Sequence, residues 1–135
     1  MQPQPDEEAR RWWLQAVHDL DTAAYLLDGG RFSTACFHAQ QAAEKALKAY
    51  LYGRGEEMVR GHSVAVLCQE AAAYDAEFAA LLQDASPLDR NYIPTRYPNG
   101  LPGGVPYMAY NRSAAEEALG QCRKVLETVR RCGGL

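Results

Sequence analysis

The stretch FSTACFHAQQAAEKALKAYLY, residues 32–52, decides the fold. Its apolar side chains recur every three or four positions, at Phe32, Ala35, Cys36, Ala39, Ala43, Ala46, Leu47 and Tyr50. That spacing predicts one apolar face of a helix. Much of the face is alanine, which lets a neighbouring backbone come close. Because the stretch contains neither glycine nor proline, we expect it to be the firmest helix and to lie at the centre of the fold.

The other side of this helix carries polar residues: Gln41, Glu44, Lys45 and Lys48. Glu44 precedes Lys48 by four positions, the favourable order for an ion pair on a helix, worth about 0.2–0.5 kcal/mol. We expect these two side chains to form a solvated or an interhelical pair. If they were partly buried beside Arg96, they would form a polar cluster on one rim of the bundle.

The size and composition of the chain indicate an ordinary globular protein. A chain of 135 residues is the length of one domain, so residues 1–135 are expected to form a single one. Apolar residues make up 47% and charged residues 23%, as in soluble proteins. No apolar run approaches the roughly 20 residues of a membrane helix, and the acidic N-terminus lacks a signal segment. We therefore expect a cytoplasmic protein without a membrane partner.

Cysteine usage gives no indication of a metal site. The chain has four cysteines, Cys36, Cys68, Cys122 and Cys132, and no C-x-x-C pair. The first three lie on apolar helical stripes, where buried free thiols are expected. Because zinc sites require clustered ligands, we expect neither a metal nor a cofactor.

The formal net charge of −3 conceals an asymmetry along the chain. Residues 1–89 contain 7 basic and 14 acidic residues, whereas residues 90–135 contain 7 basic and 3 acidic residues. The two halves therefore carry −7 and +4. They could neutralise each other within the domain, or the second half could contact a polyanion.

Apolar periodicity predicts an all-α, up-and-down antiparallel bundle of four main helices plus a short extra one. Residues 1–5 are expected to form a loose tail. The first helix would begin at the acidic residues 6–8 and end at Gly29-Gly30, which leaves only a short turn before the second. Ser63 is expected to begin the third helix, and Asp75 to cap the short one. A capping box at residues 113–116 would open the last helix.

The segment from Leu88 to Tyr110 differs in kind. It holds four prolines between Pro94 and Pro106, three glycines and four tyrosines. A loop of more than 20 residues is long for a compact domain, and such loops are usually functional or disordered. We therefore look here for binding residues.

Three motifs occur in an order and spacing that resemble the HEPN domain family. They are Q-x-x-E-K-x-L-K-A at Gln41–Ala49, Gly61-His62-Ser63, and Arg96-Tyr97-Pro98. The resemblance extends from about Ala9 to Val129 and implies a helical bundle that is often a homodimer. Small stand-alone prokaryotic members of this kind pair with a minimal nucleotidyltransferase, and many such pairs resemble toxin–antitoxin systems.

The resemblance also implies that, in such pairs, the transferase can modify a tyrosine of the HEPN protein with AMP. Tyr92 and Tyr97 lie in the matching region, and Tyr107 and Tyr110 follow later. This reading makes the protein a non-catalytic, or at best weakly catalytic, partner.

The alternative is a metal-independent RNase toxin. Enzymatic members carry an Arg, four to six residues and a His near the start of a late helix. Here the Arg–His strings are Arg11 with His18 and Arg31 with His38, both early in the chain, and no His follows His62. The chain therefore departs from the nuclease pattern. If cleavage occurs, His62 as base and Arg96 as phosphate cation are the candidates. His62 could instead only hold the loop before Ser63.

Arg96 is the main binding candidate. Its guanidinium offers a bidentate fork for phosphate, and Tyr97 beside it could stack on a base. The predicted site for a nucleotide or RNA phosphate is completed by Glu44, Lys48 and His62. Arg96 could instead tie the long loop to a carboxylate such as Glu44 or Asp89.

Trp12 and Trp13 are adjacent, so in a helix their side chains point about 100° apart. One of them is expected in a subunit interface, where tryptophan is common. The alternative is that Trp12 only covers the edge of the bundle.

Overall fold

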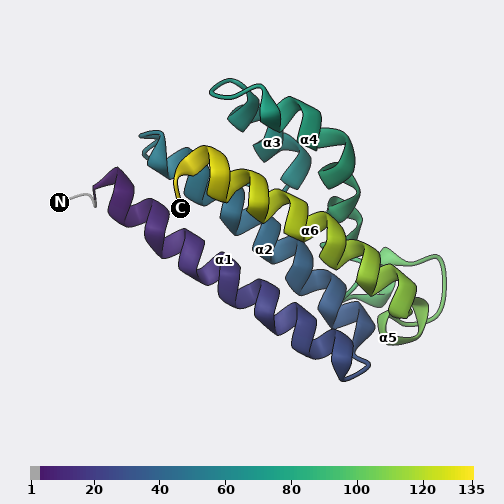
Figure 1. The fold of residues 1–135 in the computed structure, drawn as a ribbon. Coiled ribbons are helices and arrows are strands. Elements are labelled where there is room, and N and C mark those ends of the chain that lie inside the picture. Colours follow the sequence, from purple (N-terminus) through teal and green to yellow (C-terminus); the bar gives the residue numbers. More distant parts are fainter. Residues whose placement is uncertain (1–3) are drawn as a thin grey trace.

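A computed structural model describes residues 4–135, and every regular element in this range is a helix. The all-α class is therefore confirmed. Helix α1 (Pro5–Asp28) and α2 (Phe32–Gly53) are antiparallel, and α6 (Arg112–Gly133) packs on both (Figure 1). Figure 1 also shows that the two ends of the described chain lie at the same end of the bundle.

Helix α2 is the centre of the fold, as predicted. It buries 14 residues, compared with eight in α6 and four in α1. All eight positions of the predicted stripe are buried or pack against the core. Small side chains let the helices approach closely: a Cβ on Gly53 would lie 3.3 Å from the Cβ of Ala9. The alanines of α2 therefore fix how near α1 and α6 can come.

Two nine-residue helices, α3 (Val64–Ala72) and α4 (Glu77–Ala85), form a hairpin over α2 and α6. Ser63 begins α3 as predicted, because its side chain accepts a hydrogen bond from the Val66 N–H. Asp75 accepts one from the Glu77 N–H at the start of α4. A 3₁₀ helix, η1 (Ser86–Asn91), follows directly, and its Leu88 is buried.

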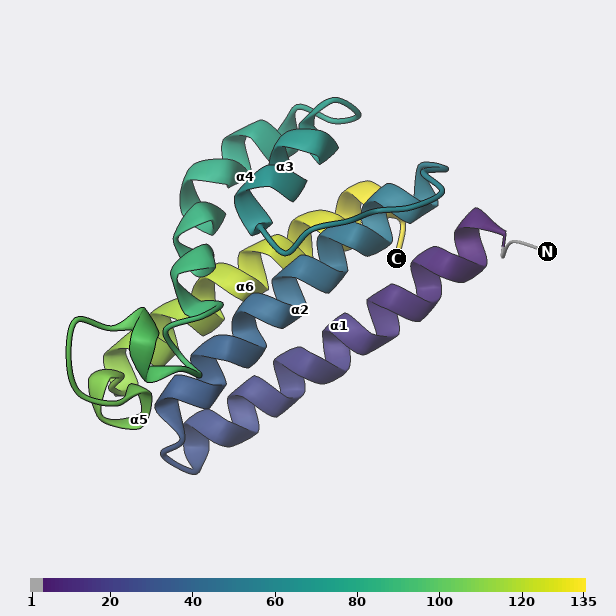
Figure 2. The same cartoon turned by 180° about the vertical axis from the view of Figure 1, so that it is seen from behind.

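The connection from α2 to α3, residues 54–63, runs back along α2 (Figure 2). Val59 is buried in it, and the Val59 N–H donates to the hydroxyl of Tyr52. The amide of Gln40 donates to the carbonyl of His62 at 2.8 Å. These contacts hold the connection against the polar side of α2.

The segment 88–110 is more ordered than a plain loop. Besides the end of η1, it contains the 3₁₀ turn η2 (Pro98–Gly100) and the short helix α5 (Pro106–Ala109), at the far end of the bundle from the termini (Figure 2). The capping box predicted at residues 113–116 was two residues late. Asn111 is the N-cap of α6, and its side chain accepts from the Ala114 N–H.

The predicted tail of residues 1–5 is corrected at its end, because Pro5 already begins α1. Proline suits the first turn, where its missing N–H would have no helical partner. The rest of that prediction, at residues 1–3, falls outside the described residues. None of the helices in residues 4–135 is long and apolar enough to cross a membrane.

Both tryptophans find partners within the chain. Trp12 stacks on Tyr52 with ring centroids 5.6 Å apart, and its Nε1 donates to Glu8. Trp13 packs against the core. Trp12 thus lies at the bundle edge against Tyr52, and a place for either tryptophan in a subunit interface stays a prediction.

The predicted burial of three thiols is confirmed. Cys36, Cys68 and Cys122 are buried and free, and burial raises the pKa of each above its ordinary value.

We expect Ala43→Phe to destabilise the protein by about 1–3 kcal/mol, because Ala43 is fully buried and a larger side chain would overpack the contact of α2 with its neighbours. Urea unfolding followed by circular dichroism measures the change. Ala79→Phe, on the exposed side of α4, is the matched control. Equal stability of the two variants would show that this face of α2 is loosely packed.

Candidate functional site

Arg96 lies among three aromatic rings. Its Cζ is 4.3 Å from the ring centroid of Phe37, 4.8 Å from that of Tyr92 and 5.1 Å from that of Tyr97. Nε donates to the carbonyl of Tyr92 at 2.9 Å. No carboxylate within residues 4–135 pairs with the guanidinium, so Arg96 does not tie the loop to Glu44 or Asp89. Its terminal nitrogens therefore remain available to an anion from solution.

The backbone around Arg96 is a tight turn. The N–H groups of Arg96 and Tyr97 both donate to the carbonyl of Ile93. Thr95 is buried, and its hydroxyl donates to the carbonyl of Asn91 at 2.7 Å. The chain then folds back so closely that a Cβ on Gly100 would lie 2.9 Å from the Cα of Pro94. This packing fixes the direction in which the Arg96 side chain leaves the loop.

His62 approaches the same aromatic group from the connection 54–63. Its Nδ1 lies 3.2 Å from Oε1 of Glu44, and its ring stacks on Tyr92 with centroids 4.9 Å apart and planes 17° apart. The side chain is nevertheless 59% exposed. His62 does hold the loop before Ser63, as one reading predicted, and in addition it presents a ring edge to solvent.

Glu44 and Lys48 form a buried pair, neither solvated nor interhelical. Lys48 Nζ lies 3.2 Å from Oε2 of Glu44 within the same helix, and the two side chains are only 7% and 5% exposed. Trp12 covers the pair, with its ring centroid 5.4 Å from Nζ. Helical spacing correctly predicted that Glu44 and Lys48 pair. It did not predict that α1 and the connection 54–63 cover this side of α2.

Asp89 joins the two elements that carry His62 and Tyr92. Its carboxylate, on η1, accepts from the Ser63 hydroxyl at 2.8 Å and from the N–H groups of Val64 at 2.7 Å and Ala65 at 3.1 Å. A carboxylate at this position also interacts favourably with the positive end of the α3 dipole. Asp89 is therefore committed to holding η1 against the start of α3.

The structure brings all the predicted site residues into one contiguous group. We call the following residues the Arg96 cluster: Phe37, Glu44, Lys48, His62, Tyr92, Arg96 and Tyr97. Ligand binding there stays a prediction.

Sequence reasoning missed two members of this neighbourhood, Phe37 and Gln40. Phe37 lies off the apolar stripe of α2, and an aromatic residue on the polar side of a helix was the signal that could have found it. No sequence signal identified Gln40, which is fully buried and bonds to the backbone of His62.

The residues of the two early Arg–His strings do not belong to the Arg96 cluster. Arg11 pairs with Glu8 at 2.9 Å, and His18 is exposed on α1. Nδ1 of His38 is buried without a hydrogen-bond partner among the described residues, and burial lowers the pKa of this imidazole below its ordinary value. Both strings lie in α1 or at the start of α2, rather than near the start of a late helix.

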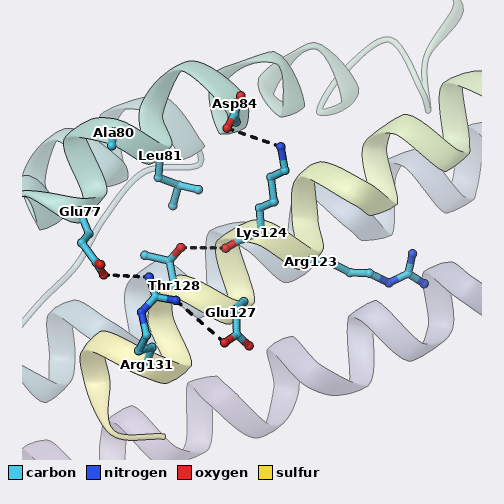
Figure 3. Close-up of a pocket in the computed structure, with 9 residues that line it drawn as sticks. All are labelled: Glu77, Ala80, Leu81, Asp84, Arg123, Lys124, Glu127, Thr128 and Arg131. Atoms are coloured by element: carbon cyan, nitrogen blue, oxygen red, sulfur yellow. Dashed lines mark hydrogen bonds and ion pairs between the residues drawn. The ribbon is translucent and has the colours of Figure 1, made fainter.

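A separate hollow of about 520 Å³ lies between α4 and α6. Figure 3 shows Asp84 directed toward Lys124 and Glu77 toward Arg131, and the separations are 3.5 and 2.9 Å. Here the acidic first half of the chain and the basic second half neutralise each other. Lys124 and Arg131 in this hollow already pair with carboxylates, whereas Arg123, which also lines it, has no ion-pair partner among residues 4–135.

Within residues 4–135, one group of potential metal ligands occurs, at Asp75, Glu77 and Cys132 beside this hollow. The thiol of Cys132 donates to Glu77 at 2.7 Å, and burial together with the two carboxylates raises its pKa to about 12. Arg131 occupies the same carboxylate of Glu77. The group is explained by these contacts, so we assign no metal to it.

Comparison with known proteins gives a consistent picture. The family model described as "HEPN domain" matches residues 9–132. A relative named "Putative toxin MJ1304", from Methanocaldococcus jannaschii, is 27% identical over an alignment of 131 residues that covers 90% of this chain and 86% of the relative.

Solved structures agree with the family match. TT1696 from Thermus thermophilus is 42% identical, with a TM-score of 0.85 over 92% of this chain and 97% of its own. An archaeal HEPN homologue is 36% identical, with a TM-score of 0.78 over 93% and 98%. An HEPN domain protein from Thermotoga maritima is 27% identical, with a TM-score of 0.69 over 90% and 96%.

Proposed function

The chain belongs to the HEPN domain family, and from this premise we propose that it is a toxin-like HEPN protein that binds a nucleotide or an RNA phosphate at Arg96. Its partner would be a minimal nucleotidyltransferase in a toxin–antitoxin-like pair. The similarity to a protein named as a toxin supports the first part. The single observation that carries the binding site is the unpaired guanidinium of Arg96 among three aromatic rings.

The chemistry of the Arg96 cluster suits a nucleotide. Two nitrogens of a guanidinium can hydrogen-bond to one phosphate, and aromatic side chains can stack on any base. From Arg90 to Ala115 the chain has three arginines and no acidic residue, so no carboxylate of this segment would repel a bound phosphate. Glu44, the nearest buried carboxylate, is neutralised by Lys48.

We expect Arg96→Ala to weaken binding of AMP or a short RNA about ten- to hundred-fold, because a charge-assisted hydrogen bond contributes about 1.5–3 kcal/mol. Isothermal titration calorimetry measures the affinity. Arg96→Lys should retain part of it, since it keeps the charge and loses the fork. Arg11→Ala and Arg31→Ala are the controls and should bind like the wild type.

Unfolding of Arg96→Ala would make this residue a structural clamp and would refute the binding site. Undiminished affinity would do the same.

The alternative function is a metal-independent RNase. The observation that favours it is the contact of His62 Nδ1 with Glu44 beside Arg96, which resembles a base held by a carboxylate. Cleavage of labelled RNA that disappears in His62→Ala would establish this function. Cleavage that disappears in His38→Ala or His18→Ala would instead move the site away from the Arg96 cluster.

Tyr97 is the better candidate for modification by the transferase partner. Tyr97 is 51% exposed, whereas the ring of Tyr92 is covered by His62 and Arg96. After incubation with ATP and a minimal nucleotidyltransferase, we expect mass spectrometry to find an adenylyl group on Tyr97. Tyr97→Phe should prevent the labelling and Tyr92→Phe should not. The opposite result would identify Tyr92 as the acceptor.

The assembly we propose is a homodimer. Because both tryptophans have partners within the chain, the exposed apolar residues on the outer side of α1 are the better contact: Leu14 is 54% exposed and Tyr25 is 78% exposed. They are eleven positions apart, so they lie on nearly the same side of the helix. Light scattering at tens of micromolar should give a dimer mass, and Leu14→Glu with Tyr25→Glu a monomer mass. A monomer in the wild type would refute the dimer.

A further inference from the structure

A hollow of about 360 Å³ lies where α1 begins and where α2 and α6 end, at the end of the bundle opposite the segment 88–110 (Figure 1). Its volume falls within the range of about 300–1,000 Å³ that small-molecule sites occupy. None of its lining residues belongs to the Arg96 cluster. We call it the helix-end hollow, and its lining includes Asp6, Arg10, Tyr50, Gly53, Arg54 and Gly133.

Small residues bring two sides of this hollow together. Ala9 of α1 lies so near Gly53 of α2 that a Cβ on Gly53 would be 3.3 Å from the Cβ of Ala9. Arg10 and Arg54 are the next residues on these two helices, so this close contact also brings their backbones near each other. Both arginines line the same hollow. One small molecule in the hollow can therefore contact Arg10 and Arg54 together.

The charged side chains of the helix-end hollow are not used within the chain. Asp6, Arg10 and Arg54 form no ion pair in residues 4–135. Asp6 and Arg10 do not pair even though they are four positions apart on one helix, a spacing at which ion pairs form. In the hollow between α4 and α6, by contrast, four charged side chains pair with one another. The helix-end hollow thus offers two cations and one anion to a ligand.

Tyr50 adds a hydroxyl group to the hollow. This residue is only 3% exposed, and its hydroxyl makes no hydrogen bond within residues 4–135. In that range, Nδ1 of His38 is the one side-chain atom that is both enclosed and without a partner. The Tyr50 hydroxyl is therefore open to the hollow that the residue lines. Burial raises the pKa of Tyr50 above its ordinary value, so the hydroxyl keeps its proton and can donate it in a hydrogen bond.

Arg54 is held close to Tyr50 by the end of α2. It is the C-cap residue of this helix, and its backbone N–H donates to the carbonyl of Tyr50 at 3.1 Å. Its guanidinium lies over the ring of Tyr74, with Cζ 5.5 Å from the ring centroid. Such stacking uses the face of the guanidinium and leaves the N–H groups at its edge available. Tyr50 and Arg54 can therefore donate to the same carboxylate.

We propose that the helix-end hollow binds an acidic amino acid. Such a ligand carries two carboxylates and one ammonium group, which complement the two guanidiniums and one carboxylate of the hollow. Arg54 and the Tyr50 hydroxyl hold one carboxylate, Arg10 holds the other, and Asp6 accepts from the ammonium group. Arginine suits this task because its planar fork can donate two parallel hydrogen bonds to one carboxylate. This site is separate from the proposed nucleotide site and does not depend on it.

Calorimetry of the whole chain with L-glutamate and with L-aspartate tests the proposal. We expect saturable binding of at least one of them. The corresponding dicarboxylate, glutarate or succinate, lacks the ammonium group, and the corresponding amide, L-glutamine or L-asparagine, lacks one carboxylate. Each of these should bind about ten-fold more weakly or worse, because a charge-assisted hydrogen bond is lost.

Four variants test the roles of the lining residues. Arg10→Gln, Arg54→Gln and Tyr50→Phe should each weaken binding of the amino acid about ten-fold or more. Asp6→Asn should bind the amino acid and the dicarboxylate with equal affinity, a change in ratio that a merely structural role of Asp6 would not produce. Circular dichroism shows whether each variant is folded, and Arg10→Gln, at an exposed position, keeps the test open if Arg54→Gln does not fold.

Arg11→Gln is the matched control. Arg11 is the neighbour of Arg10 on α1, but it pairs with Glu8 and does not line the hollow, so this variant should bind like the wild type. Absence of saturable binding of both amino acids at millimolar concentration would overturn the proposal. A dicarboxylate that binds the wild type as tightly as the amino acid would also overturn it, as would binding that Arg10→Gln and Arg54→Gln leave unchanged.

Discussion

The arrangement of the residues in the Arg96 cluster depends on the buried ion pair between Glu44 and Lys48. Removing one partner of such a pair typically costs about 3–5 kcal/mol, because a charge then remains buried and unpaired. The pair lies on the central helix, with Lys48 and Glu44 at 7% and 5% exposure, and α1 and the connection 54–63 cover it. Trp12 arrives from α1, Tyr52 holds Trp12 from α2, and the connection 54–63 brings His62.

A series of contacts leads from the same pair to Arg96. Glu44 holds His62, the ring of His62 stacks on Tyr92, and Tyr92 lies against Arg96. The contacts run from α2 through the connection 54–63 to the segment after η1, which carries both Tyr92 and Arg96. Asp89 holds η1 against Ser63 and the start of α3. The alanine-rich packing of α2 supplies the rigid base on which this series of contacts stands.

Much of the fold could be predicted from local physics. The apolar stripe of residues 32–52 defined the central helix, and Ser63 was recognised as the start of the third helix, because both signals depend on near neighbours in sequence. The start of α6 was misplaced because Asn111 caps it ahead of the capping-box pattern. Helical spacing also paired Glu44 with Lys48 but could not show that distant segments cover them. For the same reason it missed Phe37 and Gln40, whose importance comes from residues more than 20 positions away.

The most direct test of the Arg96 cluster as a ligand site is an NMR titration of the whole chain with 3′-AMP. The Nε–H of Arg96 and the backbone amides of Tyr92 and Tyr97 report on the loop, and the amides around Arg123 and Arg131 report on the hollow between α4 and α6. We expect saturable shifts confined to the first group, with His62 among the affected residues. Shifts centred on Arg123 and Arg131 instead, or no saturable shift at Arg96, would contradict the assignment.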